Sequence, residues 1–413
     1  MTVAAGDGWP HREGEFVRPE NTGEGSLDHA ERSFFLLGPA ADAAMTYFYG
    51  QLFAMDAEIR AMFPPAMDRQ RMRFFRALAR IAAGQDDLAG LVPYLEGLGR
   101  SHRKFGVRER HYDVFRRALM ATLQKYAAAG WDSGAQNAWE GAFDHAARIM
   151  MDAAKRDGED SPAWWTGTVT HTERRAPDIA VLTVEPGQPM GYLPGQYVSV
   201  QTLHRPRLWR KYSIANAPRA DGLLRLHVRA VAGGLVSPVL VNQVRPGDPL
   251  VLGAAAGTMT ADTRSARDVL CLAGGTGLAP IKAVIEAIIT AAPPGRRREI
   301  VLYYGARRRQ DLYDLAELHE MERAYPWLQV IAATSDEPAQ DVMSGTVLSG
   351  TVLSGTVLSG TVMSGTVPEL AARAAVADRD VYISGPDEMI VRTSEVVMGR
   401  GAPSRLIRYD VAS

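Results

Sequence analysis

The sequence predicts a multidomain fold in which an all-α domain is followed by an antiparallel β-barrel and then by a doubly wound α/β domain. Three observations lead to this order. Apolar residues first recur at spacings of three and four, as in amphipathic helices. Short alternating apolar runs bounded by Gly and Pro begin near Trp164, which is typical of antiparallel strands. From Asp268 onward, strand and helix patterns alternate, which indicates a parallel sheet covered by helices. The domains we expect are 26–157, 163–263 and 267–413, after a flexible tail at 1–25.

The composition is that of a globular protein with room for several domains. The chain has 413 residues, of which 46% are hydrophobic and 23% are charged, values close to the average for globular domains. A net charge of −1 gives no indication of a nucleic-acid partner. No apolar run approaches the roughly 18 residues of a spanning helix, and the N-terminus lacks a secretory signal pattern. One cysteine, Cys271, excludes an internal disulfide. We therefore expect a cytoplasmic protein without a membrane span.

The helical segment contains one candidate ligand for a haem iron. Haem proteins need a neutral imidazole that reaches the metal from a helix, and His102 lies between two helical segments in Gly-Arg-Ser-His-Arg-Lys-Phe-Gly. A single helical histidine is more often a surface or core residue, so the interpretation depends on its neighbours. Tyr49 and Phe63 precede it in Tyr-Phe-Tyr-Gly-Gln and Ala-Met-Phe-Pro, followed by Gln70, and Tyr112 comes ten residues after the histidine.

This ordered set of residues resembles the globin domain of bacterial flavohaemoglobins. The resemblance implies that His102 binds the iron of haem b, that Phe63 packs against the porphyrin, and that Tyr49 and Gln70 face the bound gas. A tyrosine hydroxyl can donate a hydrogen bond to a partly anionic oxygen ligand. Tyr112 would orient the His102 ring from behind. We expect these positions to form the catalytic haem site.

A flavin site is predicted from two segments of the β-rich region. Leu-Pro-Gly-Gln-Tyr-Val-Ser-Val precedes Arg-Lys-Tyr-Ser-Ile-Ala-Asn by a short connection, and together they resemble the FAD-binding barrel of the ferredoxin–NADP reductase superfamily. The resemblance implies that Arg210 pairs with the flavin phosphate through its forked cation, while Tyr212 and Ser213 contact the isoalloxazine. Gly-Gly-Leu-Val-Ser resembles a second phosphate-binding segment. The FAD-binding residues we expect are Tyr197, Arg210, Tyr212, Ser213, Gly233, Gly234, Val236 and Ser237.

A nicotinamide site is predicted where Ala-Gly-Gly-Thr-Gly-Leu-Ala-Pro follows an apolar strand and opens a helix. Glycines allow a dinucleotide to approach the backbone, and the helix start favours its phosphates. The spacing differs from G-x-G-x-x-G and resembles the NAD(P) domain of the same superfamily. The residues we expect at this site are Gly274, Gly275, Thr276, Gly277, Arg307, Ser384, Gly385 and Pro386. Arg307 and its two arginine neighbours could bind the 2′-phosphate of NADPH or form a solvated turn; the resemblance favours NADH.

Three positions depart from the families that the chain resembles. The carboxylate expected on the last globin helix falls near Ala154, with Asp152 and Asp157 out of register. Ser384 stands where many relatives carry Cys. Tyr409-Asp is followed by Val-Ala-Ser instead of an aromatic residue that would cover the flavin. These departures predict a weaker electron push on the iron and a more exposed flavin.

A short repeat has no place in either resemblance. Ser-Gly-Thr-Val occurs five times at a period of five residues within 344–367, a period too short for the known solenoids. We interpret it as a loop inserted into the last domain and assign it no catalytic role. A β-hairpin or an aggregation-prone strand is the alternative, because Thr-Val-Leu is uncharged and strand-forming.

Together the resemblances imply an enzyme, an oxidoreductase in which electrons pass from NADH or NADPH to FAD and then to haem. The expected activity is nitric oxide dioxygenation, with the small molecules O2 and NO as partners. A haem-based sensor of O2 or NO is one alternative, and a haem-flavin oxidase or reductase with another acceptor is the second. We expect a monomer or weak dimer.

Overall fold

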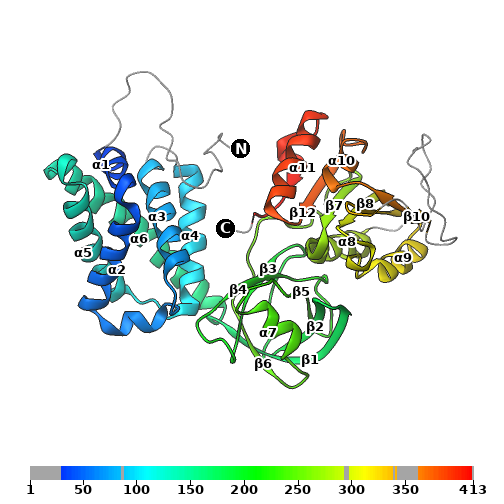
Figure 1. The fold of residues 1–413 in the computed structure, drawn as a ribbon, viewed down its shortest axis with the longest axis horizontal. Helices are drawn as coiled ribbons and strands as arrows, with labels where there is room; N and C mark the ends of the chain where they lie inside the picture. The colour runs from blue at the N-terminus through cyan, green and yellow to red at the C-terminus, as the bar shows by residue number, and fades with distance from the viewer. Residues whose placement is uncertain (1–28, 85–87, 293–296, 338–339, 342–360, 412–413) are drawn as a thin grey trace. The chain divides into compact units, whose positions relative to one another are not determined.

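The computed structural model describes residues 29–84, 88–292, 297–337, 340–341 and 361–411. The chain divides into two compact units, Met1–Trp164 and Trp165–Ser413 (Figure 1). The predicted tail at 1–25 lies outside the described residues. Among the helices that are described, none combines the length and the apolar character needed to cross a bilayer.

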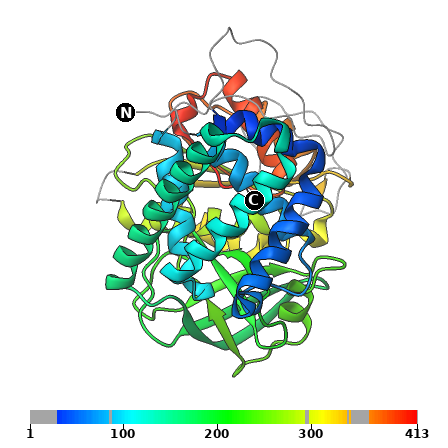
Figure 2. The same ribbon diagram turned by 90° about the vertical axis from the view of Figure 1, so that its left-hand side faces the viewer.

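The first unit is all-helical, as predicted (Figure 2). Its helices are α1 (His29–Leu37), α2 (Ala41–Met55), α3 (Asp68–Ala83), α4 (Leu88–His102), α5 (Glu109–Tyr126) and α6 (Ser133–Asp160), with short 3-10 turns η1 (Gly38–Ala40), η2 (Ala57–Met62), η3 (Arg103–Phe105) and η4 (Ala128–Gly130) between them. The core is aromatic. Phe34 packs on Phe75 with ring centroids 4.8 Å apart. The fully buried Trp139 donates from its indole nitrogen to the Ser33 hydroxyl at 2.8 Å.

The second unit begins with an antiparallel barrel. Its elements are β1 (Trp165–Ala176), β2 (Ile179–Pro186), β3 (Tyr197–Thr202), β4 (Arg210–Ser213), β5 (Leu224–Arg229), α7 (Ser237–Asn242) and β6 (Pro249–Leu252). The strand order is β4-β3-β6-β1-β2-β5. A bridge between Ile214 and Leu226 brings the two edge strands together and nearly closes the barrel. Alternate residues point inward and fill it with Val and Leu side chains.

A seven-stranded sheet follows in the order β10-β11-β9-β8-β7-β12-β13. Its elements are β7 (Val269–Gly274), η5 (Gly275–Gly277), α8 (Leu278–Ala291), β8 (Ile300–Ala306), η6 (Arg309–Asp311), α9 (Leu315–Ala324), β9 (Leu328–Thr334), β10 (Gln340–Asp341), β11 (Thr361–Ser364), α10 (Val367–Ala371), β12 (Asp380–Ser384), α11 (Asp387–Gly399), η7 (Ser404–Leu406) and β13 (Ile407–Arg408). Apart from the β10–β11 pair, all neighbouring strands are parallel. The predicted order of helical, barrel and doubly wound domains is confirmed.

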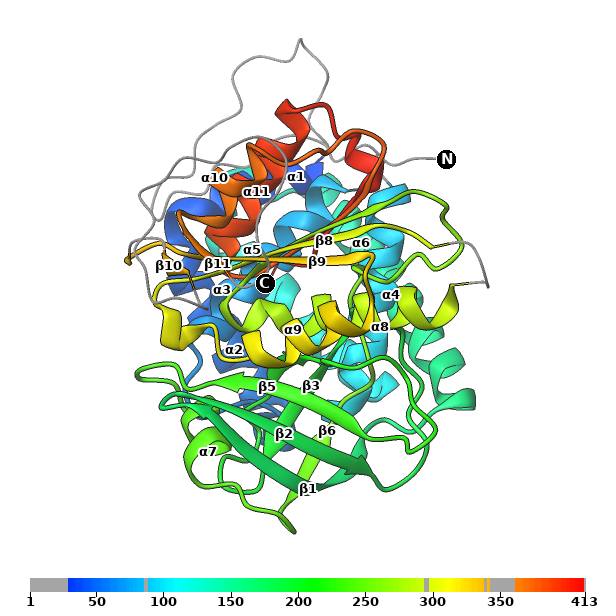
Figure 3. The same cartoon turned by 90° about the vertical axis from the view of Figure 1, so that its right-hand side faces the viewer.

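Helices cover both faces of this sheet (Figure 3). On one face, α10 and α11 pack against β7, β8 and β12. On the other face lie α8 and α9, and Figures 1 and 3 both place these two helices between the sheet and the barrel. Met259, at the end of the barrel, packs into the same apolar core as the α8 residues Ile281 and Val284. The position of α8 therefore determines how the two domains of this unit meet.

The predicted repeat insert at 344–367 needs one correction. Residues 342–360 lie outside the described part of the chain, but residues 361–364 form β11, which pairs in parallel with β9. Val367 begins α10. The end of the repeat is therefore part of the sheet, because Thr and Val favour strands and β9 has an edge available for pairing.

Candidate active site

The helical unit brings three of the predicted haem-site residues together. Tyr49 lies on the inner face of α2 and is 4% exposed. Gln70, in the first turn of α3, donates from Nε2 to the Tyr49 hydroxyl oxygen at 3.4 Å. Phe63, which directly follows η2, meets the Tyr49 ring edge to face with centroids 5.4 Å apart. Two helices and the turn between them thus bring these three side chains into contact around the Tyr49 hydroxyl.

The Tyr49 hydroxyl is a hydrogen-bond donor without an acceptor among the described residues. Burial raises the pKa of Tyr49 and outweighs the opposite effects of Gln70 and Arg71, so the hydroxyl stays protonated at neutral pH. Because the Gln70 amide donates to the oxygen, the proton of Tyr49 remains available for another acceptor. The group fits the role of donor to a partly negative ligand.

His102 ends α4, and one of its ring nitrogens is held by the backbone. Its Nδ1 lies 2.6 Å from the carbonyl oxygen of Leu98. A carbonyl can only accept a hydrogen bond, so Nδ1 carries the proton and Nε2 keeps its lone pair. Burial lowers the pKa of His102, which also favours the neutral ring. This donor set fits a haem iron bound through Nε2.

Tyr112 and Asp157 make no hydrogen bond to His102 among the described residues. Tyr112 is partly buried on α5, and burial raises its pKa to about 12. Asp157 is engaged elsewhere: it forms a close ion pair with Arg103, which further donates to the carbonyl of Ser161 at 2.6 Å. The orienting role of Tyr112 stays a prediction, since Leu98 already holds the ring.

The barrel brings the predicted flavin residues onto one strand pair. Tyr197 on β3 lies opposite Ser213 on β4, and Tyr212 is the next residue along the same strand. Burial raises the pKa of Tyr212, so its hydroxyl stays neutral. Arg210 is half-buried and uses one donor on the carbonyl of Trp209. Its other donors have no partner among the described residues, which fits a phosphate ligand.

The second phosphate segment is a tight loop before α7. Gly233 has φ of +70°, a conformation that favours glycine. A Cβ on Gly234 would lie 2.9 Å from the carbonyl oxygen of Val231. The backbone N–H of Val231 donates a hydrogen bond to the Ser237 hydroxyl at 3.0 Å. Val236 is buried. Ser237 therefore holds the loop closed, and phosphate binding by this loop stays a prediction.

The two predicted nicotinamide segments pack directly on each other. Gly274 ends β7, Gly275 to Gly277 form η5, and Ser384 ends the neighbouring parallel strand β12. A Cβ on Gly277 would lie 2.5 Å from the backbone of Ser384 and Gly385, and one on Gly274 would lie 3.4 Å from the Pro386 ring. The approach of this backbone requires glycine at 277, whereas a Cβ at 274 would meet chiefly the flexible Met389 side chain, at 2.5 Å. The strand ends meet at the sheet edge where dinucleotides bind in such folds.

Arg307 lies exposed in the turn after β8, beside this edge. The turn is fixed by its backbone: the Arg307 carbonyl accepts from the N–H of Asp336 at 3.0 Å, and the N–H of Arg309 donates to Glu337 at 2.8 Å. Cationic and acidic side chains thus share the turn. The geometry is compatible with either NADH or NADPH.

No pattern in the sequence predicts the contact made by Asp410. Its carboxylate accepts from the N–H and the hydroxyl of Thr258 at 2.9 and 2.7 Å and from the N–H of Met259 at 3.3 Å. A Cβ on Gly257 would lie 2.5 Å from this carboxylate and 3.2 Å from the Tyr197 ring. The C-terminal segment is therefore bound to the barrel next to a predicted flavin residue.

Comparison with protein families identifies the same three parts. The Globin family matches residues 46–150, the Oxidoreductase FAD-binding domain matches 167–260, and the Oxidoreductase NAD-binding domain matches 271–395. These matches confirm the predicted classes of cofactor: haem, FAD and a nicotinamide dinucleotide. The fold and its sites define a haem- and flavin-dependent oxidoreductase.

Individual relatives narrow the class further. A flavohemoprotein of Bordetella parapertussis is 30% identical over 285 residues, which cover 63% of this chain and 69% of the relative. A flavohemoprotein of Rhizobium meliloti is 25% identical over 391 residues, or 89% of this chain and 93% of the relative. The chain belongs to the flavohemoprotein family.

A solved structure has the same architecture. The crystal structure of a flavohemoglobin from Malassezia yamatoensis, with bound FAD and heme, aligns with a TM-score of 0.70 at 16% identity and covers 92% of this chain and 99% of that one. At this identity the match supports the shared fold.

Proposed function

We propose that the protein is an NAD(P)H-dependent nitric oxide dioxygenase that converts NO and O2 into nitrate. The observation that carries the proposal is the buried Tyr49 hydroxyl, held by Gln70 with its proton free, in a globin unit that precedes a reductase unit. Such a donor stabilises negative charge that develops on a bound oxygen ligand. Membership of the flavohemoprotein family supports the same electron path.

The chain's own residues provide a site for each cofactor. Bound haem would supply the redox-active iron at which the two gases react, and FAD and NAD(P)H would supply the electrons. His102 offers Nε2 to the iron, and the Leu98 carbonyl fixes the orientation of the ring. Tyr49 donates to the charged ligand, and Phe63 keeps its neighbourhood apolar. Arg210 offers its free donors to the flavin phosphate.

The electron balance sets the stoichiometry. Each nitrate formed from NO and O2 requires one electron, and each reduced nicotinamide delivers two electrons as a hydride. One NAD(P)H therefore supports two molecules of nitrate, and the ratio of nitrate formed to cofactor consumed is a direct check of the reaction.

A sensor of O2 or NO, or an oxidase or reductase with another acceptor, is the second candidate. It is favoured by the contacts of His102 and its neighbours: His102 bonds to a neutral carbonyl, and Asp157 is paired with Arg103. A neutral partner gives the imidazole less electron density to donate than a carboxylate would. Slow NO turnover, together with an output that depends on a partner protein, would favour the sensor.

The test begins with an anaerobic visible spectrum of the purified protein before and after NADH or NADPH is added. We expect the haem bands to shift to the reduced form, and we expect rapid NO consumption with nitrate formation once O2 is present. His102→Ala should lose the haem bands and the NO consumption together. If the nicotinamide fails to reduce the haem, the proposed electron path is wrong.

The proposal includes a cellular setting. We place the enzyme in the cytoplasm as a monomer or weak dimer that acts on dissolved gases and binds no nucleic acid, in keeping with a net charge of −1. Light scattering after size-exclusion chromatography measures the oligomeric state. A stable oligomer larger than a dimer would contradict the proposed monomer or weak dimer.

A further inference from the structure

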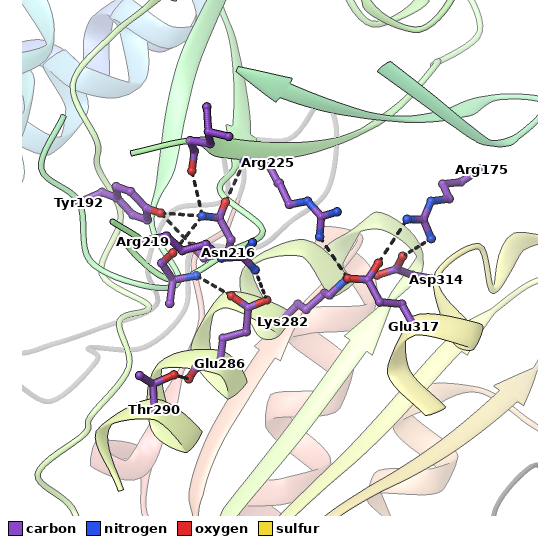
Figure 4. A network of polar contacts seen from close by, with 12 residues as sticks. Arg175, Tyr192, Asn216, Arg219, Arg225, Lys282, Glu286, Thr290, Asp314 and Glu317 are labelled. Atoms are coloured by element: carbon purple, nitrogen blue, oxygen red, sulfur yellow. Dashed lines mark hydrogen bonds and ion pairs between the residues drawn. The ribbon is translucent and has the colours of Figure 1, made fainter. Parts of the chain in front are cut away.

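A buried ion network joins the barrel to the nucleotide domain within the second unit (Figure 4). Its centre is Lys282 on α8, which is 1% exposed. The ammonium nitrogen lies 2.6 Å from the carboxylate of Asp314, just before α9, and 2.8 Å from that of Glu317 on α9. The side chain of Asp314 is fully buried. One lysine thus holds two carboxylates of the nucleotide domain side by side.

Two arginines of the barrel reach the same carboxylates. Arg175 on β1 lies 3.0 Å from Asp314 and 3.2 Å from Glu317, and Arg225 on β5 lies 3.1 Å from Glu317. Burial alone would raise the pKa of Glu317, but Lys282 and the two arginines outweigh burial and lower it to about 2. The carboxylate is therefore charged at physiological pH, and the ion pairs that join the two domains stand on their geometry.

The next turn of α8 makes a second contact with the barrel. Glu286 accepts from the backbone N–H of Ala217 at 3.0 Å and from the guanidinium of Arg219 at 3.0 Å. Ala217 lies four residues after Ser213, at the end of the segment predicted to bind flavin. Because Lys282 and Glu286 are four residues apart, they lie on one face of the helix. This face of α8 is turned to the barrel, as Figure 4 shows.

The two contacts are linked on the barrel side by one amide side chain. Asn216 accepts from the N–H of Arg225 at 2.7 Å and donates to the Tyr192 hydroxyl at 3.1 Å and the Leu223 carbonyl at 3.0 Å. It also donates to the carbonyl of Ala217 at 2.9 Å. The backbone that Glu286 binds and the strand that carries Arg225 are thus held together.

Helix α8 connects this interface to the nucleotide turn. It begins at Leu278, directly after Gly277 of η5, so Lys282 follows the turn by little more than one helical turn. Reaction between two bound cofactors needs the reacting atoms about 3–3.5 Å apart, and a misplacement of about 1 Å can cost about a hundredfold in rate. Any movement of α8 against the barrel would change that separation directly.

We propose that Lys282 and Glu286 are positioning residues that fix the nucleotide turn relative to the flavin strand for hydride transfer. When both cofactors are bound, the nicotinamide would give up a hydride to FAD and a solvent proton would complete the reduced flavin, while Lys282 and Glu286 hold the two sites at a fixed separation. Buried ion networks contribute little net stability compared with apolar packing, but they can select one arrangement. The proposal rests on the reductase chemistry of the family and is independent of NO as substrate.

Three variants of the full-length holoenzyme test the proposal. Glu286→Ala removes the contact of α8 with Ala217 and Arg219, and Lys282→Met removes the central charge at similar length. Glu299→Gln is the matched control, because its exposed carboxylate pairs with Arg379 at 3.7 Å, away from this network. If Lys282→Met fails to fold or to retain FAD, the proposal is judged on Glu286→Ala alone, because this residue lies at the edge of the network.

The first readout is anaerobic flavin bleaching after rapid mixing with NADH or NADPH, without NO. At saturating cofactor we expect hydride transfer to slow about tenfold in Glu286→Ala and about a hundredfold in Lys282→Met. The apparent Kd for the nicotinamide should stay within about threefold, because neither residue contacts the predicted nucleotide site. The control should match the wild type. Wild-type bleaching rates in FAD-loaded variants would overturn the proposal.

The second readout is the distance between two spin labels, measured by pulsed electron resonance on the same proteins. Thr168→Cys on the barrel and Glu395→Cys on α11 are exposed positions, and the natural Cys271 is fully buried, so labelling should be selective. We expect a narrow distribution in the wild type and the control, and a broader or shifted one in the two network variants. Slow hydride transfer with an unchanged distribution would also overturn the proposal, since these residues would then not act through position.

Discussion

Removing the Tyr49 hydroxyl should weaken the hold on bound oxygen while leaving the globin fold intact. Tyr49→Phe keeps the ring that packs on Phe63 and deletes the donor whose proton is free. A hydrogen bond to a charged group contributes about 1.5–3 kcal/mol. Each 1.4 kcal/mol or so corresponds to about tenfold in an equilibrium constant. The O2 dissociation rate of the reduced protein should therefore rise about ten- to a hundredfold.

The assay is laser photolysis or rapid mixing of the reduced protein with O2, followed by steady-state NO consumption. Tyr47→Phe is the matched control on the same helix. Its ring packs edge to face on Tyr126 and under the Lys125 ammonium, and its hydroxyl makes no hydrogen bond in the described chain. The control should release O2 at the wild-type rate and have the same melting temperature.

One result would refute the reasoning on Tyr49. If Tyr49→Phe releases O2 within about twofold of the wild-type rate, the hydroxyl does not donate to the ligand. The effect must also exceed that of Gln70→Ala, because Gln70 acts on the ligand mainly through the tyrosine oxygen that it holds at 3.4 Å.

Three further predictions concern stability and cofactor binding. The pKa of Glu317 is lowered from 4.5 to about 2, which stabilises the fold at pH values above about 4.5 by about 3 kcal/mol. This contribution should be lost as the pH falls toward 2, so denaturant titrations of the wild type and Glu317→Gln should converge at low pH. Trp139→Phe removes the buried indole that donates to Ser33 and should cost about 2 kcal/mol in the free energy of unfolding, and an unchanged melting temperature would contradict the assigned packing. Gly277→Ala would place a Cβ 2.5 Å from the facing backbone and should weaken nicotinamide binding at least tenfold by calorimetry, whereas Gly399→Ala, which meets nothing within 4 Å, should bind normally.

The elements of the fold were predictable because their signals are local. The apolar run from Val269 predicts a buried strand, and the structure has β7 there. The helix predicted at the glycine-rich segment begins at Leu278, because η5 leads into it without a break. The order of residues along the chain was enough to identify Tyr49 and Gln70 as candidates. Their contact could not be predicted, because it depends on how α2 and α3 pack.

The interdomain network was beyond sequence reasoning for a physical reason. Lys282 is the one cation of α8 and lies in the apolar run Leu-Ala-Pro-Ile-Lys-Ala-Val-Ile. From the sequence alone, such a lysine is expected to be solvated. Its partner Asp314 is 32 residues away, and Arg175 meets that same aspartate across 139 residues. Partners this far apart in the sequence produce no periodic pattern of charged residues. They face each other only after both domains have folded, so the pairing could not be predicted.

The last copy of the repeat shows how the sequence that follows a segment determines whether a helix begins there. In the last copy, Gly365 adopts φ of +137°, and Thr366 caps α10 in a reciprocal box with Glu369, whose carboxylate accepts from the Thr366 N–H at 2.7 Å. In each of the other four copies, the residue three positions after the threonine is serine, which is too short to return to the backbone in this way. The acid at 369 therefore lets the fifth copy start a helix, and the repeat unit by itself does not contain that information.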